Sequence, residues 1–263
     1  MERVSRGDYD SRILLETDDE FSNIARHFNE MTERIKASMA DQQAKEEEIK
    51  TLYKNEASMN ETLLQMMASN KQGYFETIKA LVNAEDEKDA YTKGHCERVM
   101  NYSLNIGKSI NLTEKDMDIL RFGAILHDLG KIGIPEQILN KGTALTNEEL
   151  ALIRQHPSIG ARILNDLTFM QDSIRIVHEH HEWHDGHGYP RKLKGEEIDL
   201  LARIVCVADA FDAMTTQRPY RKKAMTIVEA IQELRDKSGT QFDPGLVKVF
   251  VSLLEQDLIE NLA

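Results

Sequence analysis

The chain has 263 residues, 41% hydrophobic and 30% charged, which leaves room for one sizeable domain plus an extension or for two small domains. It contains no apolar run of about 18 residues or more and begins without a secretory signal, so the sequence predicts no membrane span. The net charge of −12 argues against a nucleic-acid polymer as partner. Two cysteines, Cys96 and Cys206, provide no disulfide framework and favour a reducing cytoplasm; we expect both to be small buried residues rather than metal ligands.

The first long element that the sequence predicts is a helix with a seven-residue repeat. No glycine or proline occurs between Asp8 and Gln72. Ten of the fifteen a and d positions are apolar: Phe21, Ile24, Phe28, Met31, Ile35, Ile49, Leu52, Met59, Leu63 and Met66. Such heptads predict a coiled coil, most simply a parallel homodimer, whereas the alternative is a long helix packed on its own domain.

The first residues carry a second signal. The segments GDYDSRI and DDEFSNIARHFNEMTERI resemble the second half of a HAMP module, the helical relay beneath membrane receptors. This resemblance implies a partial HAMP module at residues 1–37. With the heptads it predicts a coiled-coil signalling helix at 38–73, followed by a separate domain at 74–263. It also implies a cytoplasmic location. The full-length protein would then be anchored in the inner membrane through a segment upstream of this chain.

From Gly73 onward the pattern predicts many short helices and an all-α fold. Thr113 with Asp116, and Thr146 with Glu149, have the spacing of helix N-terminal caps. The run RIVCVADAF is β-branched but stands among helix formers. We therefore expect a long N-terminal helix followed by a helical bundle.

The stretch HDLGKIGIP at residues 127–135 is the most specific signal for chemistry. His127 and Asp128 follow an apolar helix, and a carboxylate has two oxygens with which to bridge two ions. Gly130 and Gly133 let the backbone turn close to such a site. Lys131 is placed to meet a phosphate oxygen or a departing alkoxide.

Further histidines are expected to complete a metal site. His95 and His156 are unremarkable alone, but the segment VHEHHEWHDGHGYP holds five histidines within ten residues. We expect His180 and His181 to be ligands, because the glycine-rich DGHGYP that follows predicts a loop. His178, His184 and His187 are expected near the site or exposed.

The segment RIVCVADAFDAMTTQRPYR supplies the last candidates. Asp209 is expected to be a terminal ligand, and Asp212, one helical turn later, to orient a histidine. Basic residues follow at 218 and at 221–223, a cluster suited to phosphate or guanine, although a solvated basic face would look the same. Together, five histidines and two aspartates favour two ions of iron or manganese that share a carboxylate, which is a phosphoester-cleaving arrangement.

These motifs, in this order, resemble the HD-GYP phosphodiesterases, a bacterial branch of the HD superfamily. The resemblance covers roughly residues 75–255 and implies hydrolysis of cyclic di-GMP to linear diguanylate, and on to GMP, by a hydroxide held between divalent transition-metal ions. Iron or manganese is favoured over magnesium, zinc, cobalt or nickel. Tyr91 stands where some members have a third-metal glutamate, which favours two metals.

The resemblance also assigns roles to individual residues. One metal is implied at His95, His127, Asp128 and Asp209, and the other at Asp128, His156, His180 and His181. Lys131 is implied at the scissile phosphate, and substrate contacts are implied at Gly188, Tyr189, Pro190, Arg218 and Arg221. His187 and Lys192 replace the family's usual serine and glycine, respectively. The alternatives are a hydrolase of another cyclic dinucleotide, such as cyclic GMP-AMP, and a catalytically silent cyclic di-GMP-binding module.

Overall fold

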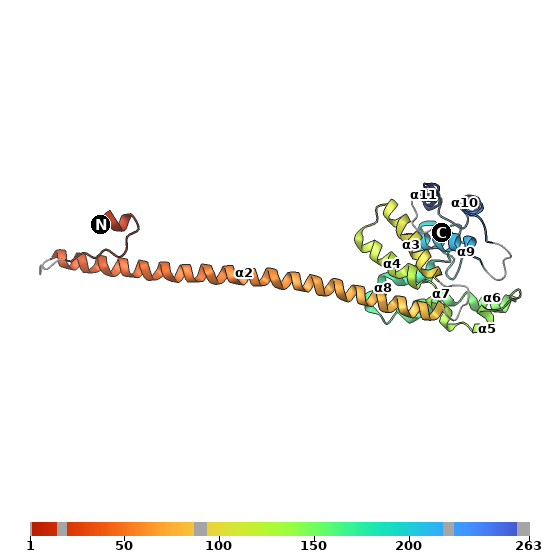
Figure 1. Cartoon of the computed structure of the whole chain (residues 1–263), viewed down its shortest axis with the longest axis horizontal. Helices are drawn as coiled ribbons and strands as arrows, with labels where there is room; N and C mark the ends of the chain where they lie inside the picture. The colour runs from red at the N-terminus through yellow and green to blue at the C-terminus, as the bar shows by residue number, and fades with distance from the viewer. Residues whose placement is uncertain (1, 15–19, 87–93, 218–223, 257–263) are drawn as a thin grey trace. The chain divides into compact units, whose positions relative to one another are not determined.

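The computed structural model describes residues 2–14, 20–86, 94–217 and 224–256 (Figure 1). Every regular element in these ranges is a helix, so the all-α prediction is confirmed. In chain order the α-helices and 3-10 helices (η) are α1 (Glu2–Ser5), α2 (Glu20–Asp86), α3 (His95–Ser109), α4 (Glu114–Leu126), η1 (Leu129–Gly133), α5 (Glu136–Leu139), α6 (Asn147–Ile153), α7 (His156–Leu164), η2 (Thr168–Met170), α8 (Gln171–Glu179), η3 (Gly195–Glu197), α9 (Leu200–Thr215), α10 (Ile227–Asp236) and α11 (Pro244–Glu255).

The chain divides into two compact units, Met1–Gln72 and Gly73–Ala263. In the first unit the segment before α2 folds back along that helix. The backbone N–H of Ile13 donates to Asn29 Oδ1 at 3.0 Å, and Asn29 Nδ2 donates to the carbonyl of Ile13 at 2.9 Å. An ion pair between Arg12 and Glu33 reinforces this register.

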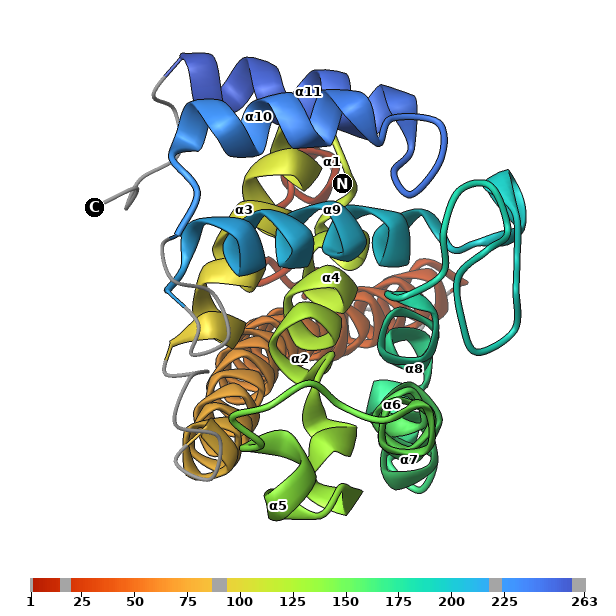
Figure 2. The same cartoon turned by 90° about the vertical axis from the view of Figure 1, so that its right-hand side faces the viewer.

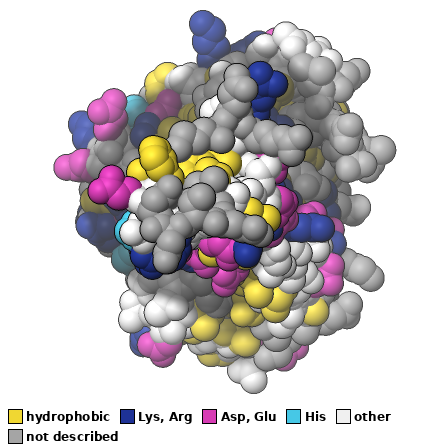
Figure 3. Space-filling view, turned by 90° about the vertical axis from the view of Figure 1, so that its left-hand side faces the viewer, with side chains coloured by type: hydrophobic (Ala, Val, Ile, Leu, Met, Phe, Trp, Pro, Cys, Tyr) yellow, Lys and Arg dark blue, Asp and Glu magenta, His cyan; other side chains and the backbone are white. Residues whose placement is uncertain are grey.

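The heptad positions of α2 are largely open to solvent in the single chain. The exposed fraction lies between 48% and 68% for Phe21, Ile24, Met31, Ile49, Leu52, Met59, Leu63 and Met66. Hydrophobic side chains also lie open among charged ones on the face shown in Figure 3. A second helix would bury the heptad seam, and the coiled-coil dimer stays a prediction.

The helix does not stop where its glycine suggested. The first region was expected to end at Gly73, but α2 continues through this residue to Asp86. A helical glycine costs roughly 1 kcal/mol relative to alanine, which is not enough to end a helix that gains burial on its far side. Ile78 and Val82, beyond Gly73, are buried in an apolar cluster of the second unit and supply that gain.

The second unit is a helical bundle built around α9. Figure 2 shows α9 between the α10–α11 pair and α4, and it contacts all three as well as α3 and α8. Ten of its sixteen residues are buried, Phe211 completely. The RIVCVADAF run is therefore a buried helix, and its β-branched residues serve the core.

The predicted caps are confirmed. Thr113 Oγ1 accepts from the N–H of Asp116, and Thr146 forms a reciprocal capping box with Glu149. Thr226 and Glu229 form the same box at α10. Within the described residues, none of the helices is both long enough and apolar enough to cross a membrane.

Candidate metal centre

The candidate ligands gather because helices of the second unit end or begin at one place. His95 is the first residue of α3 and His156 the first of α7. His127 directly follows α4, and His180 directly follows α8. Helix ends bring side chains from distant parts of the sequence together without interrupting the core.

Close backbone packing places Asp128 beside His156. A Cβ atom on Gly130 would lie 1.8 Å from the His156 carbonyl oxygen and 2.6 Å from the Gly160 nitrogen. Only glycine allows η1 to approach α7 this closely. The role expected for Gly130 therefore has a direct steric basis, and it fixes the distance between two ligand-bearing segments.

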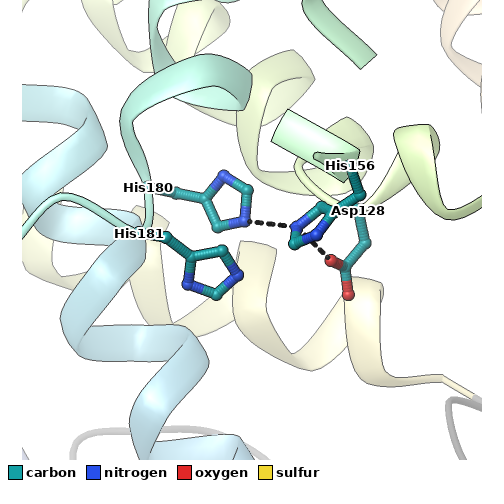
Figure 4. A group of neighbouring side chains, drawn as sticks. All are labelled: Asp128, His156, His180 and His181. Atoms are coloured by element: carbon teal, nitrogen blue, oxygen red, sulfur yellow. Dashed lines mark hydrogen bonds and ion pairs between the residues drawn. The ribbon is translucent and has the colours of Figure 1, made fainter. Parts of the chain in front are cut away.

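The structure brings the candidate ligands into two groups. Within each group, the ligand atoms all lie within 4.8 Å of one another. One group is His95, His127 and Asp128. The other is Asp128, His156, His180 and His181, which converge from three segments (Figure 4). Asp128 is therefore common to both groups.

The two oxygens of Asp128 face different groups. Its Oδ2 lies 3.5 Å from His127 Nε2 and 3.7 Å from His95 Nε2. Its Oδ1 lies 3.3 Å from His156 Nε2. Such a division is the geometry that a carboxylate bridging two cations requires.

Asp209 joins the first group from α9. Its Oδ1 lies 3.3 Å from His95 Nε2 and 3.9 Å from His127 Nε2. The first group thus offers two imidazoles and two carboxylates, whereas the second offers three imidazoles and one carboxylate.

Backbone contacts set the tautomers of three histidines. The Nδ1 atoms of His127, His156 and His180 lie 2.8, 2.8 and 2.9 Å from carbonyl oxygens of the preceding turn. A carbonyl only accepts, so each Nδ1 carries the proton and each Nε2 presents a lone pair to the centre.

These lone pairs indicate a cation site. Among the described residues, the buried Nε2 of His127 has no hydrogen-bond partner. His156 Nε2 and His180 Nε2 lie 3.3 Å apart, and two lone pairs at that distance repel unless a cation lies between them. The donor set of imidazole and carboxylate suits a transition metal. The residues present therefore fit metal ions.

His95 is oriented by a carboxylate instead of a carbonyl. Its Nδ1 lies 2.6 Å from Asp212 Oδ2, and Arg98 Nε donates to Asp212 Oδ1 at 2.6 Å. Arg98 Nη2 also donates to Oδ2 at 3.1 Å. Asp212 therefore has the contact predicted for a residue that orients a histidine, and Arg98 holds its carboxylate in place. Arg98 was missed, although it lies one turn after His95 on the same face of α3.

Burial and neighbouring charges shift the pKa values of the clustered side chains in different directions. Burial alone would raise the pKa of Asp128, but Lys131 and the surrounding histidines hold it well below its usual range. Burial alone would lower the pKa of His95, but the carboxylates of Asp128, Asp209 and Asp212 around its ring raise it well above its usual value. Burial lowers the pKa of His181 to about 3, which keeps its ring neutral and able to ligate.

Lys131 and Cys206 also line the centre. Lys131 Nζ lies 2.5 Å from Asp128 Oδ2, so its charge reaches the shared carboxylate. Cys206 is buried, and burial followed by the charge of Asp209 raises the pKa of its thiol to about 12. A protonated thiol is a poor ligand, which agrees with the structural role expected for this cysteine.

The loop after His181 folds back onto the site. The Tyr189 ring stacks on His181 with centroids 4.8 Å apart, and the Arg154 guanidinium lies 5.4 Å from the Tyr189 centroid on its ring face. A Cβ atom on Gly188 would lie 2.2 Å from the backbone nitrogen of Trp183. The two backbone segments therefore lie too close together for any residue other than glycine at position 188. Pro190 follows in a cis peptide.

Two buried glutamates anchor this loop. Glu182 accepts the backbone N–H groups of Arg191 at 2.6 Å and Leu193 at 3.0 Å. Glu179 accepts from Arg191 Nη1 at 3.0 Å and from the N–H of Asp199 at 2.9 Å. Both side chains are 1% exposed. Neither glutamate was predicted, because its only signal in the sequence is a position beside the paired histidines.

The remaining predicted residues lie elsewhere. The His187 side chain is 80% exposed, and His178 Nε2 contacts Ser158 Oγ at the surface, so neither enters the cluster. Arg218 and Arg221, like Tyr91, lie outside the described residues.

The centre opens into a pocket of about 480 Å³. Its lining includes Asp128, Lys131, His156, Tyr189 and Asp209. The pocket continues past the metal groups along α9 to α10. A ligand much larger than a single phosphate therefore has access to the centre.

A helical bundle with histidines and aspartates gathered from helix ends defines a class of protein that holds metal ions beside an open pocket. The chain belongs to the HD domain family, which its residues 61–246 match. Residues 1–37 match the HAMP domain.

Curated relatives and solved structures are similar to the chain. A cyclic di-GMP phosphodiesterase of Thermotoga maritima is 38% identical over 78% of this chain and 56% of the relative. The cyclic di-GMP phosphodiesterase response regulator RpfG of Xanthomonas campestris is 38% identical over 72% and 50%. The crystal structure of a cyclic GMP-AMP-specific phosphodiesterase of Vibrio cholerae superposes with a TM-score of 0.57 at 26% identity, covering 70% of this chain and 49% of that one. The chain spans about half the length of these relatives.

Proposed function

We propose that the chain is a metal-dependent phosphodiesterase that opens a cyclic dinucleotide, cyclic di-GMP first, to its linear form, with GMP as a further product. The observation that carries this proposal is the shared carboxylate of Asp128, whose two oxygens face two histidine groups. The names of the relatives support the substrate class, because they include enzymes for cyclic di-GMP and for cyclic GMP-AMP.

Two divalent ions, iron or manganese, would occupy the centre. One would be held by His95, His127, Asp128 and Asp209, and the other by Asp128, His156, His180 and His181. When bound, the ions supply an activated water and neutralise charge on the phosphate.

The side chains of the protein orient the substrate around that centre. Lys131 lies in the pocket beside Asp128, where its ammonium can donate to a phosphate oxygen as negative charge develops. Tyr189 stacks on His181 and, with its neighbours Gly188 and Pro190, contacts the ribose-phosphate of the substrate. Arg218 and Arg221 complete the substrate contacts in this proposal.

The N-terminal region relays a signal to this domain. We assign residues 1–37 to a partial HAMP module, 38–73 to a coiled coil, and 74–263 to the phosphodiesterase domain. The exposed heptad residues of α2 support a homodimer, since pairing would remove Ile49, Leu52 and Leu63 from water. The chain is then the output region of a receptor that reaches the membrane through an upstream segment.

Asp128→Ala tests the proposal. Purified protein loaded anaerobically with iron or manganese is incubated with cyclic di-GMP, and the products are separated by chromatography. The parent should release linear diguanylate or GMP, whereas Asp128→Ala should lose both bound metal and turnover. Asp166→Ala, which removes an exposed carboxylate, should change neither.

Two outcomes would contradict the proposal. Turnover retained in Asp128→Ala would rule out the shared carboxylate. A metal-loaded parent that binds cyclic di-GMP without cleaving it would identify a silent binding module instead.

A further inference from the structure

The pocket reaches beyond the metal groups to a part of the molecule that the proposed chemistry does not use. Beyond Asp209 its lining continues along α9 and α10. The residues there are Ala210, Ala213, Met214, Met225, Glu233, Lys237, Gln241 and Phe242. The first four form an apolar floor, and Glu233, Lys237 and Gln241 supply polar groups beside it.

The floor extends one base length from the centre. Asp209 and Met214 are five residues apart on α9, which is about 7.5 Å of helix. Met225 is tied next to Met214, because its backbone N–H donates to the Met214 carbonyl at 2.9 Å. An apolar stretch of the pocket lining therefore begins beside the metal groups and leads toward α10.

The polar residues Glu233, Lys237 and Gln241 lie together at the end of α10 and in the turn that follows it. Glu233 and Lys237 are four residues apart, one turn of helix, so their side chains emerge on the same side. The N–H of Gln241 donates to the Lys237 carbonyl at 3.1 Å. The N–H of His184 donates to the Gln241 carbonyl at 3.1 Å. This bond joins the turn after α10 to the loop that carries Tyr189.

These side chains keep their hydrogen-bonding capacity for a ligand. Glu233 and Gln241 are partly buried, and both line the pocket. Among the described residues, the side chains of Glu233, Lys237 and Gln241 make no hydrogen bond or ion pair; the contacts of Lys237 and Gln241 run through their backbone groups. The pocket lining thus combines a carboxylate, a cationic donor and an amide with the apolar residues of α9.

We propose that Glu233, with Lys237 and Gln241, forms a subsite that reads the edge of a guanine base. The inference rests on the proposed function, in which a phosphate of the substrate lies at the metal groups. The purine ring lies on the floor formed by Ala210, Ala213 and the two methionines. The carboxylate of Glu233 accepts the N1–H and the exocyclic amino group of guanine, and Lys237 or the Gln241 amide donates to O6.

Adenine does not match this arrangement. Its N1 is an acceptor, so its lone pair would face the carboxylate of Glu233, and it has no exocyclic oxygen for Lys237. A site built to hydrogen-bond one partner rejects an analogue that leaves its polar groups unpaired. A hydrogen bond to a charged group contributes about 1.5–3 kcal/mol, so guanine should be preferred by roughly tenfold to a hundredfold.

Equilibrium binding of mononucleotides tests the subsite. Calorimetric titration of metal-loaded protein with GMP and with AMP should give a dissociation constant at least tenfold lower for GMP. Glu233→Gln should reduce that ratio by about tenfold, since an amide donates where guanine also donates. Asp236→Asn is the matched control: it removes one charge from the outer face of α10 and should leave the ratio unchanged.

The outcomes separate this inference from the proposed function. Equal binding of GMP and AMP by the parent, or an unchanged ratio in Glu233→Gln, would overturn the guanine subsite, whatever the protein cleaves. Guanine-selective binding without cleavage of cyclic di-GMP would support the subsite and refute the phosphodiesterase proposal.

Discussion

The carboxylate of Asp212 joins two residues of α3, with Oδ2 2.6 Å from His95 Nδ1 and Oδ1 2.6 Å from Arg98 Nε. This contact sets the ring orientation of a candidate ligand from a neighbouring helix. A negative partner also makes His95 a stronger electron donor toward a metal than a backbone carbonyl would.

Asp212→Asn should weaken metal binding at the His95 group. The side chain keeps its shape but loses the charge that orients His95 and pairs with Arg98. Loss of such an orienting partner typically costs about tenfold to a hundredfold in metal affinity. A competition titration against a chelator measures the change, with Asp236→Asn as the control. Wild-type affinity in Asp212→Asn would show that the contact does not support the ligand.

Much of the fold could be predicted because local signals agreed with the packing. Thr113 and Thr146 cap helices through contacts within one turn, which depend on sequence alone. The unbroken helix predicted by the heptads is present, but its predicted end was wrong. Ile78 and Val82 are buried against residues that lie far away in the sequence, such as Ile125 and Val177. Burial by distant residues is invisible to a local pattern.

The candidate site divides in the same way. The histidines and aspartates stand out because several such residues occur in short motifs, and those motifs resemble a known family. Glu179 and Glu182 did not stand out, because a buried glutamate reads as a surface residue until its backbone partners are known. The contact of Gly130 with His156 likewise requires two segments to be packed together. The first kind of feature is carried by residue type and the second by tertiary structure.

Gly130→Ala should destabilise the protein and separate η1 from α7. The new methyl group would lie 1.8 Å from the His156 carbonyl oxygen, a backbone atom that cannot rotate away. Overpacking of this kind costs about 1–3 kcal/mol. Urea denaturation should report that loss, and bound metal should fall because His156 moves away from Asp128.

Gly142→Ala is the matched control. A Cβ atom there meets nothing within 4 Å, and its backbone is not in the left-handed region. Its free energy of unfolding should change by no more than about 0.5 kcal/mol. Equal effects of the two alanines would show that the close approach at Gly130 does not constrain the site.

Glu182→Gln should loosen the loop that carries Tyr189. The buried carboxylate accepts two backbone N–H groups, and an amide can accept only one while pressing its own donors against the other. A lost charged hydrogen bond of this kind costs about 1.5–3 kcal/mol. The melting temperature should fall, and the KM for cyclic di-GMP should rise as Tyr189 leaves His181.

Glu196→Gln removes an exposed carboxylate of the same loop and should leave both quantities unchanged. If Glu182→Gln behaved like this control, the two backbone contacts would be irrelevant to the loop. Glu182→Asp keeps the charge on a shorter side chain. A KM nearer to that of the parent than in Glu182→Gln, without a higher melting temperature, would show that the carboxylate positions Tyr189 separately from its effect on stability.

Lys192→Gly should stabilise the protein, because Lys192 has a φ of 58°. The left-handed region costs a residue with a Cβ atom roughly 1–2 kcal/mol, and glycine escapes most of this cost. Glycine also adds entropy to the unfolded chain, so the net gain should be about 0.5–1 kcal/mol. The family that the sequence resembles usually has glycine at this position, which agrees with its left-handed backbone.

Lys194→Gly is the control, at a φ of −129°. It should destabilise the protein, because it relieves no strain and only adds entropy to the unfolded chain. Urea denaturation of both variants measures the two signs, and a destabilised Lys192→Gly would show that the lysine side chain itself stabilises the loop.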